Sequence, residues 1–215
     1  MNDTASTELA SLLCSRLCHD LLSPVGALSN GLELLADETD PEMRQRCFEL
    51  LEQSARISAD KLRFFRLAFG AAGGFGEMVP VEEPRQLIEA LVGDAKRIEI
   101  NWALATSELP KGAVKVLLNL AQVALDSLVR GGTLDIGAEN RPGEAVEIVV
   151  RAAGPKIAFD EVIGNTLEGR MPEGGLTSRT AAARMVALVA KQAGGALQFH
   201  RGEGTLVLGA VLPRA

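Results

Sequence analysis

Cys18-His19-Asp20-Leu21-Leu22-Ser23-Pro24 places an acidic residue directly after a histidine and a proline five positions beyond it. Around this stretch, residues 7–36 repeat apolar side chains every three or four positions, which predicts one long helix with a continuous apolar stripe. The stripe consists of Leu13, Leu17, Leu21, Pro24, Leu28, Leu32 and Leu35. Because Pro24 lacks a backbone donor, the helix should bend just after His19. Three residues are suitable N-caps for its start: Asn2, Ser6 and Thr7.

A second long helix is predicted from Pro41 to about Phe69, after a polar turn at residues 36–41. Asp40 as N-cap and Pro41 at the first helical position give a clear start signal. Its apolar stripe comprises Met43, Cys47, Leu50, Leu51, Ala55, Ile57, Leu62, Phe65 and Phe69. Two long helices joined by a short turn form an antiparallel hairpin. One hairpin leaves apolar surface uncovered, whereas two hairpins paired as a four-helix bundle cover it, so we expect a homodimer.

The glycine-rich run 70–76 divides the chain into two predicted domains, residues 1–74 and residues 75–215. In the second domain, helices are expected at residues 84–95, 111–130 and 177–193. Strands are expected at residues 98–104, 133–138, 145–151, 196–200 and 205–212, the last four forming two hairpins. The fold class is therefore α+β. An N-terminal helical hairpin precedes a C-terminal α/β sandwich, with strands in one layer and helices in the other.

The composition of the 215-residue chain narrows the classes of function. The formal net charge is −6 and no basic stripe offers a surface for nucleic acid. No apolar run approaches the roughly 20 residues that cross a bilayer, and no secretory signal begins the chain, so we expect a cytoplasmic protein without membrane contact. Cys14, Cys18 and Cys47 suit a reducing compartment. His19 is rotated by about 100° from Cys18, so these side chains are not expected to form a zinc site.

His19 is predicted to project from the side of its helix opposite the leucine stripe, about 200° from Leu17. A neutral imidazole nitrogen on such a face is a good nucleophile toward an acyl phosphate. Asp20 is a candidate to orient or deprotonate the ring, and Arg16 to hold phosphoryl oxygens. An approaching partner would also contact other residues near His19: Ser15, Leu22, Ser23, Gly26 and Asn30. The second histidine, His200, follows a different pattern, near a glycine-rich turn, and is interpreted as a surface residue.

The chain resembles the catalytic portion of sensor histidine kinases, whose dimerisation helix spaces a histidine, an acidic residue and a proline as His19, Asp20 and Pro24 are spaced here. Its second half resembles the GHKL-type ATP-binding sandwich. LCHDLLSPVGALSNGLELL, followed by RLAFGAAG, is similar to the ChpT-type histidine phosphotransferases of alphaproteobacteria. That resemblance implies a dimer whose histidine accepts a phosphoryl group from the receiver domain of a hybrid kinase. It also implies transfer onward to response regulators, including a cell-cycle transcription factor, with Mg²⁺ held by the receiver and no cofactor in the phosphotransferase itself.

The residues that a kinase uses for ATP are replaced at the matching positions. A kinase helix carries two asparagines four residues apart, and the second ligates Mg²⁺. The first is Asn119 here, but the second is Val123, which offers no oxygen to the cation. The adenine-binding aspartate corresponds to Ala152, whose side chain cannot accept a hydrogen bond, and the second glycine of that motif corresponds to Lys156. The glycine-rich lid is reduced to residues 174–175, interpreted as a simple turn. We therefore expect no ATP binding.

Three hypotheses follow from the sequence. The leading one is a phosphoryl relay through His19, in which the α/β domain buttresses the bundle and adds contact area for the response regulator. The alternative is an ATP-dependent histidine autokinase with a divergent nucleotide site, which incubation with labelled ATP distinguishes. The third is a non-catalytic dimeric scaffold, in which His19→Ala leaves the output unchanged.

Overall fold

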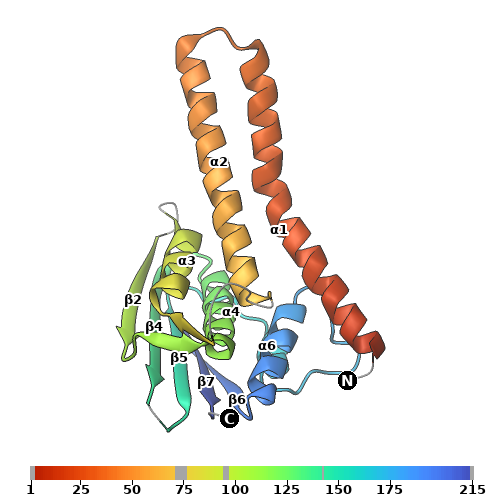
Figure 1. Ribbon diagram of the computed structural model, residues 1–215, viewed down its shortest axis with the longest axis vertical. Helices are drawn as coiled ribbons and strands as arrows, with labels where there is room; N and C mark the ends of the chain where they lie inside the picture. The colour runs from red at the N-terminus through yellow and green to blue at the C-terminus, as the bar shows by residue number, and fades with distance from the viewer. Residues whose placement is uncertain (1–2, 71–76, 94–96, 142, 214–215) are drawn as a thin grey trace.

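A long helical hairpin stands on an α/β domain in the computed structural model, which describes residues 3–70, 77–93, 97–141 and 143–213 (Figure 1). The hairpin consists of α1 (Asp3–Asp37) and α2 (Pro41–Ala68), so both predicted long helices are confirmed. The domain boundary predicted at residue 74 lies outside the described residues. Within the described part of the chain, no helix has the length and apolar character needed to cross a membrane.

The turn between the two helices is built by the cap that the sequence predicts. Asp40 Oδ1 accepts hydrogen bonds from the backbone N–H groups of Glu42 and Met43, both at 2.9 Å. Pro41 occupies the first helical position, where a missing N–H has no consequence. Arg44 closes the turn by donating to the backbone carbonyls of Leu35 and Glu38. The hairpin geometry is therefore fixed by local hydrogen bonds at its tip.

Replacing Asp40 with alanine should lower the free energy of unfolding by about 1 kcal/mol, because two N–H groups at the start of α2 lose their acceptor. Urea unfolding at a fixed protein concentration, followed by circular dichroism, measures the change. Asp37→Ala is the matched control. It removes a carboxylate from the last turn of α1, where a negative charge interacts unfavourably with the helix dipole, so it should not destabilise the protein. Equal destabilisation by the two substitutions would contradict the assignment of Asp40 as the cap.

The seam between α1 and α2 differs from the predicted stripes. The buried residues of the two helices along this seam include Pro24, Gly31, Cys47, Ser54, Ser58 and Phe65. A Cβ atom at Gly31 would lie 2.9 Å from Leu51 Cδ2, so the missing side chain allows the helices to approach closely. Ser58 meets its own hydrogen-bonding need by donating to the carbonyl of Ser54. Several predicted stripe residues remain exposed instead: Leu32, Met43, Leu50, Ile57 and Leu62.

Helix α1 begins earlier than predicted. Its first residue is Asp3, so Ser6 and Thr7 lie inside the helix and are not its N-cap, while Asn2 lies outside the described residues. Thr7 Oγ1 instead donates to the carbonyl of Asp3, four residues back. Pro24 lies inside the helix, as predicted. The axis of α1 changes direction between its outward-leaning first part and the part that runs beside α2 (Figure 1).

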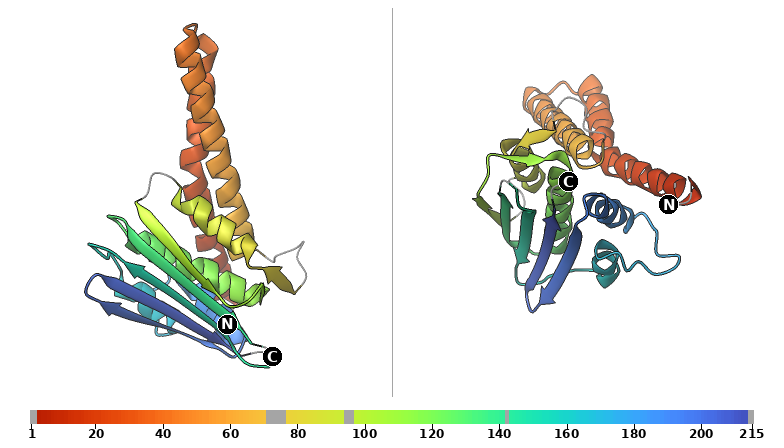
Figure 2. Two further views of the ribbon diagram at one scale, coloured as in Figure 1. Left: turned by 90° about the vertical axis from the view of Figure 1, so that its left-hand side faces the viewer. Right: turned by 60° about the horizontal axis from the view of Figure 1, so that its bottom comes forward.

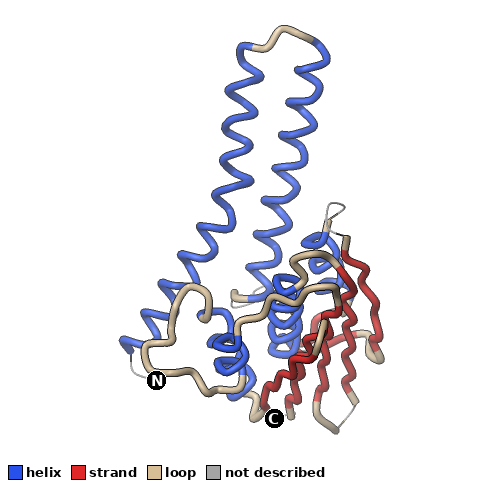
Figure 3. Tube along the Cα trace, turned by 180° about the vertical axis from the view of Figure 1, so that it is seen from behind, coloured by secondary structure: helices blue, strands red, loops and turns tan. Residues whose placement is uncertain are grey.

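The α/β domain contains one five-stranded sheet in the order β2-β4-β5-β7-β6. Its strands are β2 (Ile98–Leu104), β4 (Gly132–Asn140), β5 (Val146–Ala153), β6 (Ala196–Gly202) and β7 (Thr205–Leu212). β2 pairs in parallel with β4, and the other neighbours are antiparallel. Burial alternates along β5, so one sheet face is covered. The covering helices α3 (Glu82–Val92), α4 (Lys111–Ser127) and α6 (Ala181–Gln192) lie between sheet and hairpin (Figures 2 and 3).

Three short elements have no counterpart in the sequence prediction: β1 (Met78–Pro80), β3 (Glu108–Pro110) and α5 (Glu161–Leu167). β1 and β3 form a separate antiparallel pair. α4 ends at Ser127 rather than near residue 130, and α6 begins at Ala181 rather than residue 177. Thr177 and Thr180 form a side-chain-bonded turn before α6, which explains its later start.

The hairpin and the sandwich share one core. The last turns of α2 bury Phe64, Phe65, Leu67 and Ala68 within the main hydrophobic cluster of the sandwich. Asn119 Nδ2, on α4, donates to the carbonyl of Lys115 at 2.8 Å and to that of Ala68 at 3.4 Å. α1 also packs against α6. His19, on α1, is thereby held in a defined position relative to the sandwich.

Candidate functional site

His19 lies on the outer face of α1 with 86% of its side chain exposed. Its Nδ1 atom is 3.3 Å from Asp20 Oδ1, so the ring is oriented by the residue that follows it. With its proton on Nδ1, the ring donates to Asp20 and leaves the lone pair of Nε2 for attack. The predicted display of His19 and the predicted role of Asp20 in orienting it both fit this geometry.

Asp20 is held from three directions. Its Oδ1 faces His19, and its Oδ2 lies 3.8 Å from Nε of Arg16, one turn earlier on α1. Its backbone carbonyl accepts a hydrogen bond from Nζ of Lys61 on α2 at 2.8 Å. A second arm of Arg16, Nη2, lies 3.7 Å from Asp126 Oδ2 on α4. Arg16 is therefore engaged in ion pairs with two carboxylates, and its contact with phosphoryl oxygens stays a prediction.

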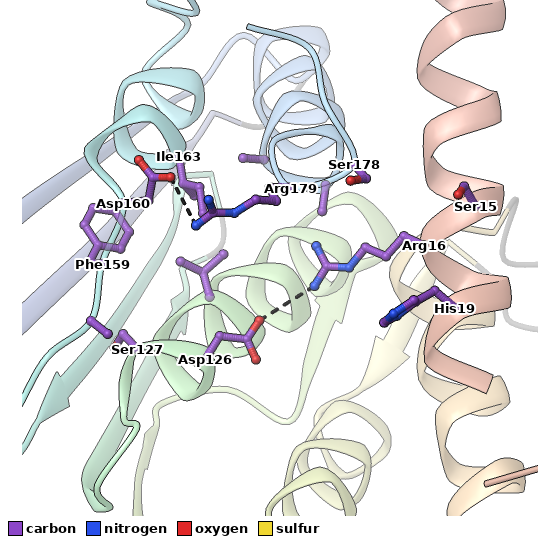
Figure 4. A pocket seen from close by; sticks show the side chains of 14 residues that line it. Ser15, Arg16, His19, Asp126, Ser127, Phe159, Asp160, Ile163, Ser178 and Arg179 are labelled. Atoms are coloured by element: carbon purple, nitrogen blue, oxygen red, sulfur yellow. Dashed lines mark ion pairs between the residues drawn. The ribbon is translucent and has the colours of Figure 1, made fainter. Parts of the chain in front are cut away.

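A groove of about 450 Å³ separates this part of α1 from the sandwich (Figure 4). Ser15, Arg16 and His19 line it from α1, while Val123, Ala182 and Ala183 are among its apolar residues on the sandwich side. Across the groove, Arg179 pairs with Asp160 at 3.2 Å. A histidine on one wall of an open groove is accessible to a second protein rather than enclosed for a small substrate.

The other predicted contact residues surround His19 on α1. Leu22, Ser23 and Asn30 are exposed, and Gly26 is half-buried. A Cβ atom at Gly26 would meet no other described part of the chain within 4 Å, so packing against those residues does not require a glycine there. Ser15 lines the groove beside His19. These five residues thus lie on α1 within about three helical turns of His19.

The positions that match the kinase nucleotide site have other surroundings here. Asn119 is buried and bonds to the end of α2, and Ala152 is fully buried in β5. Val123 is half-buried on the sandwich side of the groove that His19 lines from α1. Gly174 has a φ of +69°, and Gly175 N–H donates to the carbonyl of Pro172, so residues 172–175 form a turn.

Sequence reasoning missed Asp126, Asp160 and Arg179, three charged residues of the groove. Asp126 lies on the same face of α4 as Asn119 and Val123, seven and three residues further on. That spacing could have drawn attention to it. Asp160 is the N-cap of α5, a helix that the sequence did not reveal, whereas Arg179 lies just before α6, within the helix predicted at residues 177–193.

The remaining candidate residues for chemistry are His200 and the three cysteines. His200 is exposed on β6, as interpreted from the sequence. Cys14 and Cys18 are exposed on α1, and Cys47 is buried on α2. Across the described ranges, no three His, Cys, Asp or Glu side chains are grouped so as to hold a metal ion.

Comparison with solved structures places the fold. The histidine kinase domain of the blue-light activated histidine kinase from Erythrobacter litoralis EL346 matches 98% of this chain and 94% of its own, with a TM-score of 0.50 at 15% identity. A bacterial phosphotransferase of known structure matches 95% of this chain and 96% of its own, with a TM-score of 0.80 at 30% identity. The hairpin and sandwich therefore have the fold of a histidine kinase domain, and the match at 30% identity to a phosphotransferase indicates the phosphotransferase class.

Sequence comparisons identify the family. The model of the histidine phosphotransferase C-terminal domain matches residues 81–205. Protein phosphotransferase ChpT of Brucella abortus (strain 2308) is 32% identical over 196 residues, which cover 91% of each chain. The chain belongs to the ChpT-type histidine phosphotransferase family.

Proposed function

We propose that this protein relays phosphoryl groups between receiver domains in a two-component pathway of the cytoplasm. His19 accepts the group from the aspartyl phosphate of a hybrid kinase receiver and passes it to the aspartate of a response regulator. A regulator of cell-cycle transcription is among the recipients that the family resemblance implies. The observation that carries the proposal is the position of His19, oriented by Asp20 and open to solvent on one wall of a groove.

The proposed transfer uses the Nε2 lone pair. As the N–P bond forms, the P–O bond to the receiver aspartate breaks and its carboxylate leaves. The ring then carries a positive charge, and the Asp20 carboxylate stabilises it through the Nδ1–H group. In the second transfer, an aspartate oxygen of the response regulator attacks phosphorus and the imidazole leaves. Mg²⁺, bound in the receiver, would neutralise the phosphoryl oxygens, and this chain supplies the oriented nucleophile.

The surface for the receiver extends from the groove along the hairpin. On each helix of the hairpin, the residues to one side of the α1–α2 seam face the side on which the sandwich packs. His19, Ser23 and Asn30 turn toward this side, and three exposed apolar residues continue it: Leu34, Leu50 and Ile57. We call these three residues the docking flank. Apolar contacts beside an exposed nucleophile suit a helix of a receiver domain.

The opposite side of the hairpin supports the homodimer. Four residues lie on the other side of the seam and are exposed in the single chain: Val25, Leu32, Phe48 and Leu62. We call these four residues the dimer flank. Their spacing along the two helices makes an apolar strip that a second hairpin would cover, completing a four-helix bundle. Because the two flanks lie on opposite sides, dimerisation leaves His19 accessible.

Phe48→Glu should convert the protein to a monomer, since two copies of the new carboxylate would be buried near each other in the bundle. Sedimentation equilibrium at micromolar concentration measures the change in mass. Leu34→Glu is the matched control: it places the same charge on the docking flank and should leave the dimer intact while slowing phosphotransfer. A dimeric Phe48→Glu protein would argue against this interface.

The alternative function, ATP-dependent autophosphorylation, is tested with γ-labelled ATP. The proposal predicts no labelled protein after incubation with ATP and Mg²⁺ alone. Label should appear when a hybrid kinase and its receiver are added. The contacts of Asn119 and the burial of Ala152 support this expectation, because both positions that would recognise the nucleotide serve packing here. Labelling by ATP alone would favour the autokinase.

A further inference from the structure

A continuous chain of charged contacts joins His19 to the sandwich. His19 Nδ1 meets Asp20 Oδ1 at 3.3 Å, and Asp20 Oδ2 meets Arg16 Nε at 3.8 Å. Arg16 Nη2 then meets Asp126 Oδ2 at 3.7 Å, which crosses from α1 to α4 (Figure 4). We propose that Asp126 is a positioning residue for His19, acting through Arg16 and Asp20. The inference rests on the proposed role of His19 as phosphoacceptor.

The geometry of an arginine explains why a second carboxylate matters. A guanidinium presents a planar fork of donors that pairs readily with both oxygens of one carboxylate. Such a bidentate pair between Arg16 and Asp20 would occupy Oδ1, the oxygen that faces His19. In the structure, Arg16 Nη2 lies toward Asp126 on α4, and the ion pair of Arg16 with Asp20 runs from Nε to Oδ2. Oδ1 is thereby left for the Nδ1–H group of His19.

The charges in the cluster support the same conclusion. Arg16 alone would neutralise Asp20 and weaken it as an acceptor for the imidazole. Lys61, whose Nζ donates to the backbone carbonyl of Asp20, adds a second positive charge to the cluster. Asp126 balances it, whereas without Asp126 the cluster would carry a net positive charge that disfavours the positive charge developing on His19 during transfer. Across the groove, Arg179 and Asp160 form an ion pair at 3.2 Å, so their charges cancel each other.

Asp126 is well placed for this role because α4 is rigid. The helix is buried along most of its length, and Gln122 Nε2 donates to Asp126 Oδ1 at 2.7 Å, which orients the carboxylate on its helix. Only 22% of the Arg16 side chain is exposed, so its charge is partly shielded from solvent. The sandwich therefore contributes a fixed charge to the phosphoacceptor site without contacting the phosphoryl group.

The test uses the full-length chain and a donor that needs no docking. Phosphoramidate transfers its phosphoryl group directly to histidine, releasing ammonia, so its rate reports on His19 and not on a partner surface. Asp126→Asn keeps an acceptor for Gln122 and removes only the charge. We expect it to slow labelling by about two- to fivefold, the range that a partly exposed ion pair supplies. Long-range ¹H–¹⁵N spectra should show less of the Nδ1–H tautomer of His19.

The decisive comparison is a double-mutant cycle with Arg16→Ala. In that background Asp126→Asn should have no further effect, because the path to His19 is already broken. Asp126→Glu should restore part of the rate and of the tautomer population. Arg56→Ala is the control that should match wild type, because it breaks only the surface pair with Glu52.

Unchanged His19 ring signals in Asp126→Asn would overturn the proposal, whatever the labelling rates. An equal effect of Asp126→Asn with and without Arg16 would also overturn it. Failure of the proposed function looks different: His19→Ala would still be labelled, or the phosphorylated protein would pass nothing to any receiver. The ring signals remain a direct readout of Asp126 in that case.

Discussion

Replacing His19 with alanine should abolish phosphoryl acceptance from a phosphorylated receiver, to below one part in a thousand of the wild-type rate. The substitution removes the attacking nitrogen itself, and no water or carboxylate can replace it as a stable carrier. Because the side chain is almost fully exposed, its loss should change stability by less than about 0.5 kcal/mol. The measurement is transfer of label from a receiver to the protein, followed on gels and by the acid lability of the product.

The matched control is His200→Ala, which removes the other histidine from an exposed position on β6 and should transfer normally. His19→Gln is a second variant that retains a polar side chain of similar size and should be equally inactive. Normal transfer by His19→Ala would reject the relay through this residue. Normal biological output with no transfer at all would instead favour the scaffold hypothesis.

The hairpin was predictable because its signals are local. Asp40 and Pro41 mark the start of α2 within two residues, and the turn before it is short and polar. The seam was less predictable, because Ser54, Ser58 and Gly31 lie in it while several leucines face outward. A helix that packs on two sides carries two overlapping stripes, and apolar spacing alone does not separate them. The exposed leucines become meaningful only when a second hairpin and a partner are considered.

The elements that the sequence missed are short or depend on distant partners. β1 and β3 have three residues each and pair with one another across α3 and β2, so neither carries its own periodicity. α5 has seven residues, and its only local signal is Asp160, whose carboxylate accepts from the N–H of Val162. Tertiary context, rather than propensity, determines such elements.

Part of the candidate site was predictable from local sequence, and part depends on contacts between distant residues. His19 and Asp20 were predicted from a local motif, although adjacent helical residues point about 100° apart and the motif alone left their contact open. Arg16 was predicted from its spacing, but its ion pair with Asp126 joins residues 110 positions apart. No pattern along the chain reports such a pair. The part of the site contributed by the sandwich therefore required the structure.

Gly26→Gln should stabilise the protein and yet slow receiver-to-protein transfer by at least tenfold, a loss of roughly 1.4 kcal/mol in the transition state for transfer. Gly26 lies seven residues after His19, on nearly the same helical face and about 10 Å along the axis. A glycine in a helix interior costs about 1 kcal/mol relative to a good helix former. Among the residues that the structure describes, none outside its own helix lies within 4 Å of the position of its missing Cβ, so we infer that a partner approaches the backbone there.

Two measurements separate docking from the chemistry of His19. Thermal unfolding should show a higher midpoint for Gly26→Gln, and labelling by phosphoramidate should remain at the wild-type rate. Gly31→Ala is the glycine control, because its new Cβ lies at the α1–α2 seam, near Leu51, and not on the helical face of His19, so transfer should stay at the wild-type rate. Wild-type transfer by Gly26→Gln would show that the receiver does not cover this part of α1. Reduced transfer with a lower thermal midpoint would instead indicate damage to the hairpin. Only higher stability together with lost transfer identifies Gly26 as part of the docking surface.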